Sequence, residues 1–177
     1  MVDDKPVLLI PDAGPLITLA YANSLDLLTR PGWPVHVVDM VMHEVTRNET
    51  PTSTAIASWV NANKIVVVPT RTFAHFQQKQ ALSIEPLRKS NLGELAIQET
   101  MNTLALTDTP PVCVFLFEDH KIARPSFLLP EKCQKVSTRS FLIFLEQKGW
   151  LESAVAIERA AIRNGRHFSQ LRFPASE

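Results

Sequence analysis

The segment Val-Leu-Leu-Ile-Pro-Asp-Ala-Gly-Pro-Leu-Ile-Thr-Leu-Ala, residues 7–20, contains the first strand and the first turn of the predicted fold. Its first four residues form a short continuous apolar run, which is typical of a strand buried on both faces. Asp12 follows directly, and Gly14 with Pro15 indicates a sharp turn into a helix. Because ligands bind at the carboxyl ends of the strands in an open parallel sheet, Asp12 is a candidate site residue. Its alternative role is to cap the helix that follows.

Length and composition indicate one ordinary globular domain over residues 1–177. The chain has 177 residues, of which 45% are hydrophobic, enough for a full core. Eighteen basic and 18 acidic residues cancel. Bulk charge therefore neither indicates nor excludes a nucleic-acid partner, and a basic surface would need local clustering.

Compartment is predicted from the cysteines and from the absence of targeting signals. Cys113 and Cys133 have no metal-ligand spacing, so they are interpreted as reduced structural thiols. No apolar run reaches the roughly 18 residues that a membrane span needs. The acidic start, with Asp3 and Asp4, is unlike a signal peptide. We therefore expect a cytoplasmic protein with no membrane partner.

Strands and helices alternate along the chain. Apolar or β-branched runs predict strands at residues 7–10, 35–38, 65–68 and 112–117, with a short edge strand at Val136. Helical patterns lie at 15–22, 25–28, 40–47, 52–61, 91–104, 141–148 and 151–162. Alternating strands and helices imply right-handed crossovers and a central, mainly parallel sheet. The predicted fold class is therefore a three-layer α/β/α sandwich.

Two segments stand apart from this alternation. Residues 70–90 are interpreted as a helical insertion, ended by Pro86. Residues 163–177 are predicted to form a polar, flexible tail, made locally basic by Arg163, Arg166 and Arg172. Such a tail could contact an RNA backbone.

Four acids are predicted to meet at the carboxyl edge of the sheet. Asp12 follows the first strand, Glu44 lies early in the helix after the second, Glu94 opens the helix before the fourth, and Asp119 follows the fourth. Carboxylates gathered in this way repel one another unless a hard divalent cation neutralises them, and Mg²⁺ suits such ligands. A site of this kind suits phosphodiester hydrolysis, because a bound metal activates water and offsets charge on the leaving oxygen.

Each of these acids also has a purely structural interpretation. Asn91 and Glu94 have the spacing of a capping box. Glu44 could lie on a solvated helix face, and Asp119 could be a turn residue. One shared site explains the four positions more simply than four separate coincidences.

The motifs around these acids together resemble the PIN-domain ribonucleases. They are Asp12-Ala-Gly-Pro-Leu-Ile, Val-Met-His-Glu44-Val, Gly93-Glu94-Leu-Ala and Val-Phe-Leu-Phe-Glu-Asp119-His-Lys-Ile-Ala-Arg. The first motif is most similar to VapC-type toxins and related prokaryotic PIN proteins. The resemblance extends from about residue 7 to about residue 149, which is most of the chain.

The resemblance implies a PIN-like fold and a metal-dependent endoribonuclease that uses Mg²⁺ or Mn²⁺. The metal would be held by the residues that match the family pattern, Asp12, Glu44, Glu94 and Asp119. The products would carry 5′-phosphate and 3′-hydroxyl ends. Family members often form homodimers, and the toxins of toxin–antitoxin pairs are held inactive by a cognate antitoxin.

The chain departs from the family pattern near the fourth acid. The common pattern has a second acid a few residues after Asp119 or paired beside it, whereas here the neighbours are Glu118 before and His120 after. Glu118 could assist the site or point back into the sheet layer. Thr18, one turn after Gly14, could bond a carboxylate or a water at the metal, or only its own helix backbone. Lys121 and Arg124 are candidate RNA phosphate contacts.

Two other interpretations stay open. A phospho-acceptor or phosphatase-like α/β domain would need a second acid beside Asp12, and Pro11-Asp12-Ala13-Gly14 supplies only one. A catalytically silent PIN-like domain could serve as a binding module for protein or RNA. Loss of one of the four acids would favour the silent domain, but all four are present.

Overall fold

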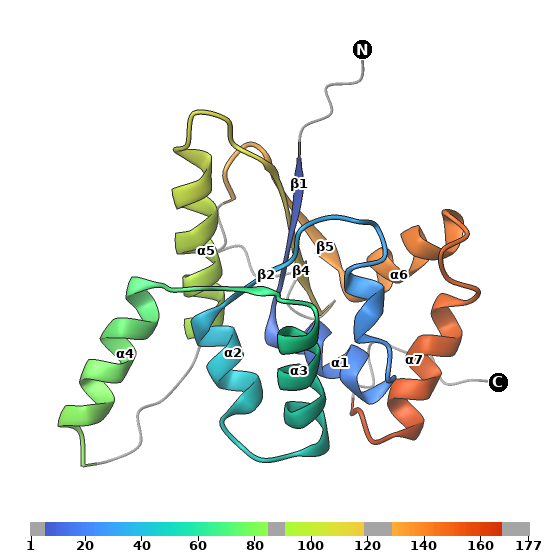
Figure 1. Cartoon of the computed structure of the whole chain (residues 1–177), viewed down its shortest axis with the longest axis horizontal. Helices are drawn as coiled ribbons and strands as arrows, with labels where there is room; N and C mark the ends of the chain where they lie inside the picture. Colours follow the sequence, from blue (N-terminus) through green and yellow to red (C-terminus); the bar gives the residue numbers. More distant parts are fainter. Residues whose placement is uncertain (1–5, 85–90, 119–128, 168–177) are drawn as a thin grey trace.

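The computed structural model describes residues 6–84, 91–118 and 129–167, in which strands alternate with helices (Figure 1). The strands are β1 (Val7–Pro11), β2 (His36–Val38), β3 (Val66–Val68), β4 (Val112–Phe117) and β5 (Cys133–Ser137). The helices are α1 (Ala13–Tyr21), α2 (Asp39–Thr46), α3 (Pro51–Ala62), α4 (Arg71–Leu82), α5 (Leu92–Ala105), α6 (Thr138–Gln147) and α7 (Ala154–Arg163). A 3-10 turn, η1, spans Leu25–Leu28.

All strand pairs in the described residues are parallel. β4 lies between β1 and β5, and β2 pairs with β3. A single parallel bridge between Leu9 and Val35 joins the two groups, where the Leu9 N–H donates to the Pro34 carbonyl at 2.9 Å. The strand order is therefore β3-β2-β1-β4-β5. Helices flank this sheet, so the predicted three-layer α/β/α class is confirmed.

The core follows the two apolar runs that were expected to be central. Leu9, Ile10 and Leu116 are fully buried, because β1 and β4 have neighbouring strands on both sides and helices over their faces. β3 has a similar composition but lies at the edge of the described sheet, and its Val66 and Val67 are 50% and 40% exposed. Burial of these strands is therefore set by their place in the sheet.

The boundaries of the last two helices differ from the prediction. α6 begins at Thr138 rather than 141, because Ser137 is its N-cap; the Ser137 hydroxyl accepts from the Ser140 N–H at 3.1 Å. α7 begins at 154 rather than 151, since Ser153 caps it by accepting from the Ala156 N–H at 3.2 Å.

The expected insertion contains α4, which lies at the outer edge of the molecule (Figure 1). Glu99 of α5 holds its start by accepting from the Arg71 N–H at 2.7 Å and the Thr72 N–H at 3.0 Å. Asp39 accepts from the Thr70 N–H at 2.7 Å. At its outer end Leu82 is 88% exposed. Residues 85–90 lie outside the described part of the chain.

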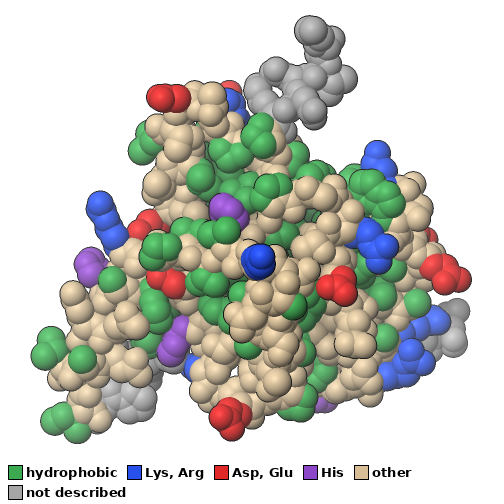
Figure 2. All heavy atoms as spheres, in the orientation of Figure 1, with side chains coloured by type: hydrophobic (Ala, Val, Ile, Leu, Met, Phe, Trp, Pro, Cys, Tyr) green, Lys and Arg blue, Asp and Glu red, His purple; other side chains and the backbone are tan. Residues whose placement is uncertain are grey.

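Neither acidic nor basic side chains predominate on the face of the molecule drawn in Figure 2. Acidic and basic side chains are interspersed there, in line with the zero formal net charge. Hydrophobic side chains show at the outer end of α4, where Leu82 and Ile84 are exposed. In the described residues, no helix is long and apolar enough to cross a membrane.

The two cysteines are free thiols on neighbouring strands. Cys113 of β4 lies opposite Cys133 of β5 in the sheet register. Burial raises the pKa of Cys113 to about 12, so this thiol stays protonated and unreactive at neutral pH. Both residues lie at the amino ends of their strands, at the sheet edge opposite the candidate acids.

We expect Glu99→Gln to lower the free energy of unfolding by about 1 kcal/mol at neutral pH, because it weakens the cap on α4. Burial raises the pKa of Glu99, but the hydrogen bonds from Arg71 and Thr72 outweigh it and bring the pKa below 4.5. A carboxyl with a lowered folded-state pKa stabilises above its unfolded pKa and loses that effect as pH falls. The difference between variant and wild type should therefore shrink below about pH 4.

Urea unfolding at pH 7 and near pH 3.5, with hydrogen exchange of the α4 amides, checks this expectation. Glu152→Gln is the matched control, because Glu152 is exposed and lies away from α4. An equal loss of stability at both pH values would contradict the role given to the Glu99 carboxylate.

Candidate active site

Asp12 is fixed at the point where β1 ends beside β4. Its backbone N–H donates to the Leu116 carbonyl at 2.8 Å, which continues the β1–β4 ladder by one residue. Asp12 occupies the N-cap position of α1, but its side chain makes no capping hydrogen bond. The side chain is only 1% exposed. The interpretation of Asp12 as a simple helix cap is therefore not what the structure shows.

Glu44 lies on the side of α2 that faces the start of α5. Gly93 makes the close approach possible, since a Cβ at this position would lie 3.0 Å from Glu44 Oε2. His43 turns the other way and packs on α4, with its ring centroid 5.3 Å from Phe73 and 5.5 Å from Phe76. Of these two adjacent residues of α2, Glu44 faces the candidate site and His43 helps to hold α4.

Glu94 lies in the first turn of α5. The predicted capping box with Asn91 is wrong: Asn91 is the N-cap residue but makes no side-chain capping hydrogen bond. Its backbone is left-handed, with φ 65°, a conformation that asparagine adopts more readily than most residues. This turn directs the start of α5, with Gly93 and Glu94, toward the end of β1.

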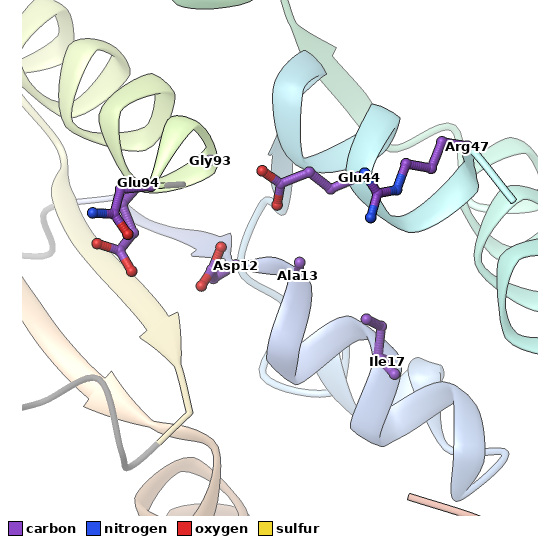
Figure 3. Close-up of a pocket in the computed structure, with 8 residues that line it drawn as sticks. Asp12, Ala13, Ile17, Glu44, Arg47, Gly93 and Glu94 are labelled. Atoms are coloured by element: carbon purple, nitrogen blue, oxygen red, sulfur yellow. The ribbon is translucent and has the colours of Figure 1, made fainter. Parts of the chain in front are cut away.

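One cavity brings the described candidate acids together. It has a volume of about 290 Å³, and Figure 3 shows the carboxylates of Asp12, Glu44 and Glu94 directed toward the same space. They come from the end of β1, from α2 and from the start of α5. The other lining residues are Ala13, Ile17, Arg47, Asn91 and Gly93. Asp119, Lys121 and Arg124 lie outside the described residues.

The oxygen donors of the cavity are of the chemical kind that a divalent cation binds. In residues 6–84, 91–118 and 129–167, no group of three or more His, Cys, Asp or Glu side chains is close enough to hold one metal ion directly. Mg²⁺ keeps several of its waters and needs only one or two direct carboxylates. The residues present therefore fit Mg²⁺ held partly through water.

Glu118 points back into the protein instead of lining the cavity. It is 1% exposed, and its Oε1 accepts from the Thr18 hydroxyl at 2.7 Å and from the Thr138 hydroxyl at 3.3 Å. Thr18 thus bonds a carboxylate, one of the roles expected for it. Gly14 provides the room, because a Cβ there would overlap the Glu118 side chain.

Arg166 completes this buried network from the far end of the chain. Its Nε donates to Thr18 Oγ1 at 2.9 Å, and its Nη2 lies 4.0 Å from Glu118 Oε1. Two residues earlier, Asn164 Nδ2 donates to the Tyr21 carbonyl at 2.6 Å. The prediction of a flexible tail from residue 163 is therefore wrong for its first residues: Arg163 ends α7, and Asn164 and Arg166 contact α1, while residues 168–177 lie outside the described part.

Sequence reasoning gave no site role to Arg47 or Gly93, and it placed Arg166 in a flexible tail instead of in the network behind α1. Arg47 lies three residues after Glu44, a spacing that places both on one side of a helix and could have drawn attention to it. Gly93 directly precedes Glu94 inside a quoted motif, but nothing local indicates its contact with Glu44. For Arg166 no signal exists, because its partner Thr18 is 148 residues away.

Comparisons with protein-family models, with curated proteins and with solved structures find no significant match to the chain. The protein has a three-layer α/β/α fold with an acid-lined cavity at the carboxyl edge of its sheet. The likeness to PIN-domain ribonucleases rests on the sequence motifs and stays a prediction.

We expect Arg166→Gln to lower the free energy of unfolding by about 2 kcal/mol, because it removes the guanidinium that lies 4.0 Å from the buried Glu118 carboxylate and donates to Thr18. The double variant Glu118→Gln, Arg166→Gln should lose less than the sum of the two single variants. Urea unfolding of the four proteins measures this coupling. Arg163→Gln, an exposed change three residues earlier, serves as the control. Additive losses would contradict a direct interaction between the two side chains.

Proposed function

We propose that the protein is a metal-dependent endoribonuclease that hydrolyses phosphodiester bonds in RNA with Mg²⁺ or Mn²⁺. The observation that carries the proposal is the convergence of Asp12, Glu44 and Glu94 on one cavity at the carboxyl edge of the sheet. In parallel α/β folds this edge is where ligands bind. Hard oxygen donors in such a group are suited to hard divalent cations.

Asp12, Glu44 and Glu94 would hold the ion. When bound, a divalent cation would supply activation of a water and electrostatic stabilisation of the phosphoryl group. The protein contributes rigidity to this arrangement. Asp12 is anchored by its backbone bond to Leu116, and Gly93 leaves room for Glu44, because a Cβ at residue 93 would lie 3.0 Å from Glu44 Oε2. Pre-positioned charges need little reorganisation as the reaction proceeds.

The buried network behind α1 supports the same positions. Thr18, Glu118 and Arg166 tie α1 to the end of β4, two elements that flank the turn carrying Asp12. A one-ångström displacement of a site residue can reduce a rate about a hundredfold, so this support bears on catalysis as well as on stability.

The choice of RNA as substrate comes from the resemblance to PIN-domain ribonucleases. The carboxylates of the cavity would serve RNA or DNA, since both carry the same phosphodiester group. The likeness to VapC-type toxins adds a cognate antitoxin and a homodimer to the proposal. The assay therefore includes both nucleic acids, and the purified protein is tested without any partner.

We expect wild-type protein to cleave single-stranded RNA with Mg²⁺ or Mn²⁺ and to be inactive in EDTA. Asp12→Asn should reduce the rate by about a hundredfold or more, because it keeps the shape of the side chain and removes a charge that holds the ion. Gel analysis of end-labelled RNA and DNA of identical sequence, with phosphatase treatment to detect 5′-phosphate products, measures both rate and chemistry.

Asp26→Asn is the matched control, because Asp26 is exposed and does not line the cavity. Thermal unfolding verifies that both variants fold. Cleavage that persists undiminished in folded Asp12→Asn would overturn the proposal, since the activity would then come from elsewhere. A folded wild type that cleaves neither nucleic acid would favour the silent binding module.

A further inference from the structure

Arg47 is the basic residue among the described residues that line the cavity. It follows the last residue of α2, and its own backbone N–H closes that helix by donating to the His43 carbonyl at 2.9 Å. Figure 3 shows its side chain extending from the end of α2 back toward Glu44, on the side of the cavity away from Glu94. A cation thus stands at one wall of a space otherwise dominated by acids.

The Arg47 guanidinium binds no other side chain or backbone group within the part of the chain that the structure describes. Among residues 6–84, 91–118 and 129–167, its side chain takes part in no hydrogen bond and no ion pair, although Glu44 lies one turn earlier on the same helix. The side chain is exposed. Its planar fork of donors is therefore available to an anion that enters the cavity.

The positive charge of Arg47 can attract a polyanionic strand, which the carboxylates repel. A divalent ion neutralises two carboxylate charges, so three carboxylates with one ion still repel a polyanionic strand. Arg47 offsets the remaining charge at the wall where a strand would pass. Arginine also binds phosphate with two parallel hydrogen bonds, which orients the bound group.

The wall beside Arg47 also presents apolar side chains to the cavity. Ala13 and Ile17 of α1 supply an apolar surface next to the acids, and Ile17 is partly exposed to the cavity. In Figure 3 Ile17 and Arg47 lie on the same side of Asp12, opposite Glu94. A cavity of about 290 Å³ has room for an ion together with a phosphate group.

We propose that Arg47 binds a backbone phosphate of the RNA strand and that Ile17 supports the sugar beside it. This inference rests on the proposed nuclease function and assigns the substrate-binding wall of that same site. The strand would then cross from the carboxylates toward α2. Because Arg47 holds a phosphate beside the carboxylates, it governs binding more than the chemical step.

The test compares wild type, Arg47→Gln and Arg47→Lys, with Arg30→Gln as the matched control. Arg30 is exposed and does not line the cavity. In Mg²⁺ we expect Arg47→Gln to raise KM for single-stranded RNA about tenfold, with kcat within about twofold. Arg47→Lys keeps the positive charge but loses the planar pair of guanidinium donors, so its KM should lie between those of wild type and Arg47→Gln.

A second readout does not depend on cleavage. In the Asp12→Asn background, fluorescence anisotropy of a labelled RNA oligonucleotide in Ca²⁺ measures binding alone at several salt concentrations. Removing one phosphate contact should reduce the slope of log Kd against log salt by about 0.7. A cation that only complements the C-terminal end of the α2 helix dipole would change stability and leave this slope unchanged.

The outcomes separate the two proposals. If wild type cleaves RNA and Arg47→Gln has an unchanged KM and salt slope, the assignment of Arg47 is overturned and the nuclease stands. If wild type binds RNA without cleaving it and Arg47→Gln weakens binding, the assignment stands and the nuclease fails. If the protein with intact Asp12 binds no RNA, both are overturned.

Discussion

The hydrogen bond from the Asp12 N–H to the Leu116 carbonyl is the contact on which the candidate site depends most directly. It extends the β1–β4 pairing to the last position before both strands leave the sheet. The backbone of Asp12 is thereby fixed while α1 turns away, and the Asp12 side chain faces the cavity instead of capping α1. Glu44 and Glu94 reach the same space only because α2 and α5 pack together next to this edge.

Two glycines permit this close packing. Gly93 lets α5 approach the Glu44 carboxylate, and Gly14 leaves room for Glu118 behind α1. The carboxylates near this edge of the sheet therefore have two different surroundings. One set lines the cavity, and Glu118 is buried among hydroxyls with Arg166 as its counter-charge. An acid next to a predicted ligand in the sequence can therefore have an entirely internal role.

The fold class was predictable because the buried parallel strands appear as continuous apolar runs, of which residues 112–117 match β4 exactly in both bounds. The exposure of Val66 and Val67 could not be predicted, because a run of valines has the same composition in a central strand and in an edge strand. Convergence of Asp12, Glu44 and Glu94 followed from their positions after strands and at helix starts. The capping box failed because Asn91 adopts a left-handed backbone, and the Arg166 contact joins residues with no local relation.

Paramagnetic broadening by Mn²⁺ in a ¹⁵N-resolved NMR spectrum tests the central claim that the carboxylates form one cation site. Substoichiometric Mn²⁺ should broaden the amide signals of Ala13 and Glu94, which lie at the cavity, and leave that of Cys133, at the opposite sheet edge, sharp. Asp12→Asn should weaken the effect. Broadening that is absent at Ala13 and Glu94, or equally strong at Cys133, would contradict a cation site at this edge.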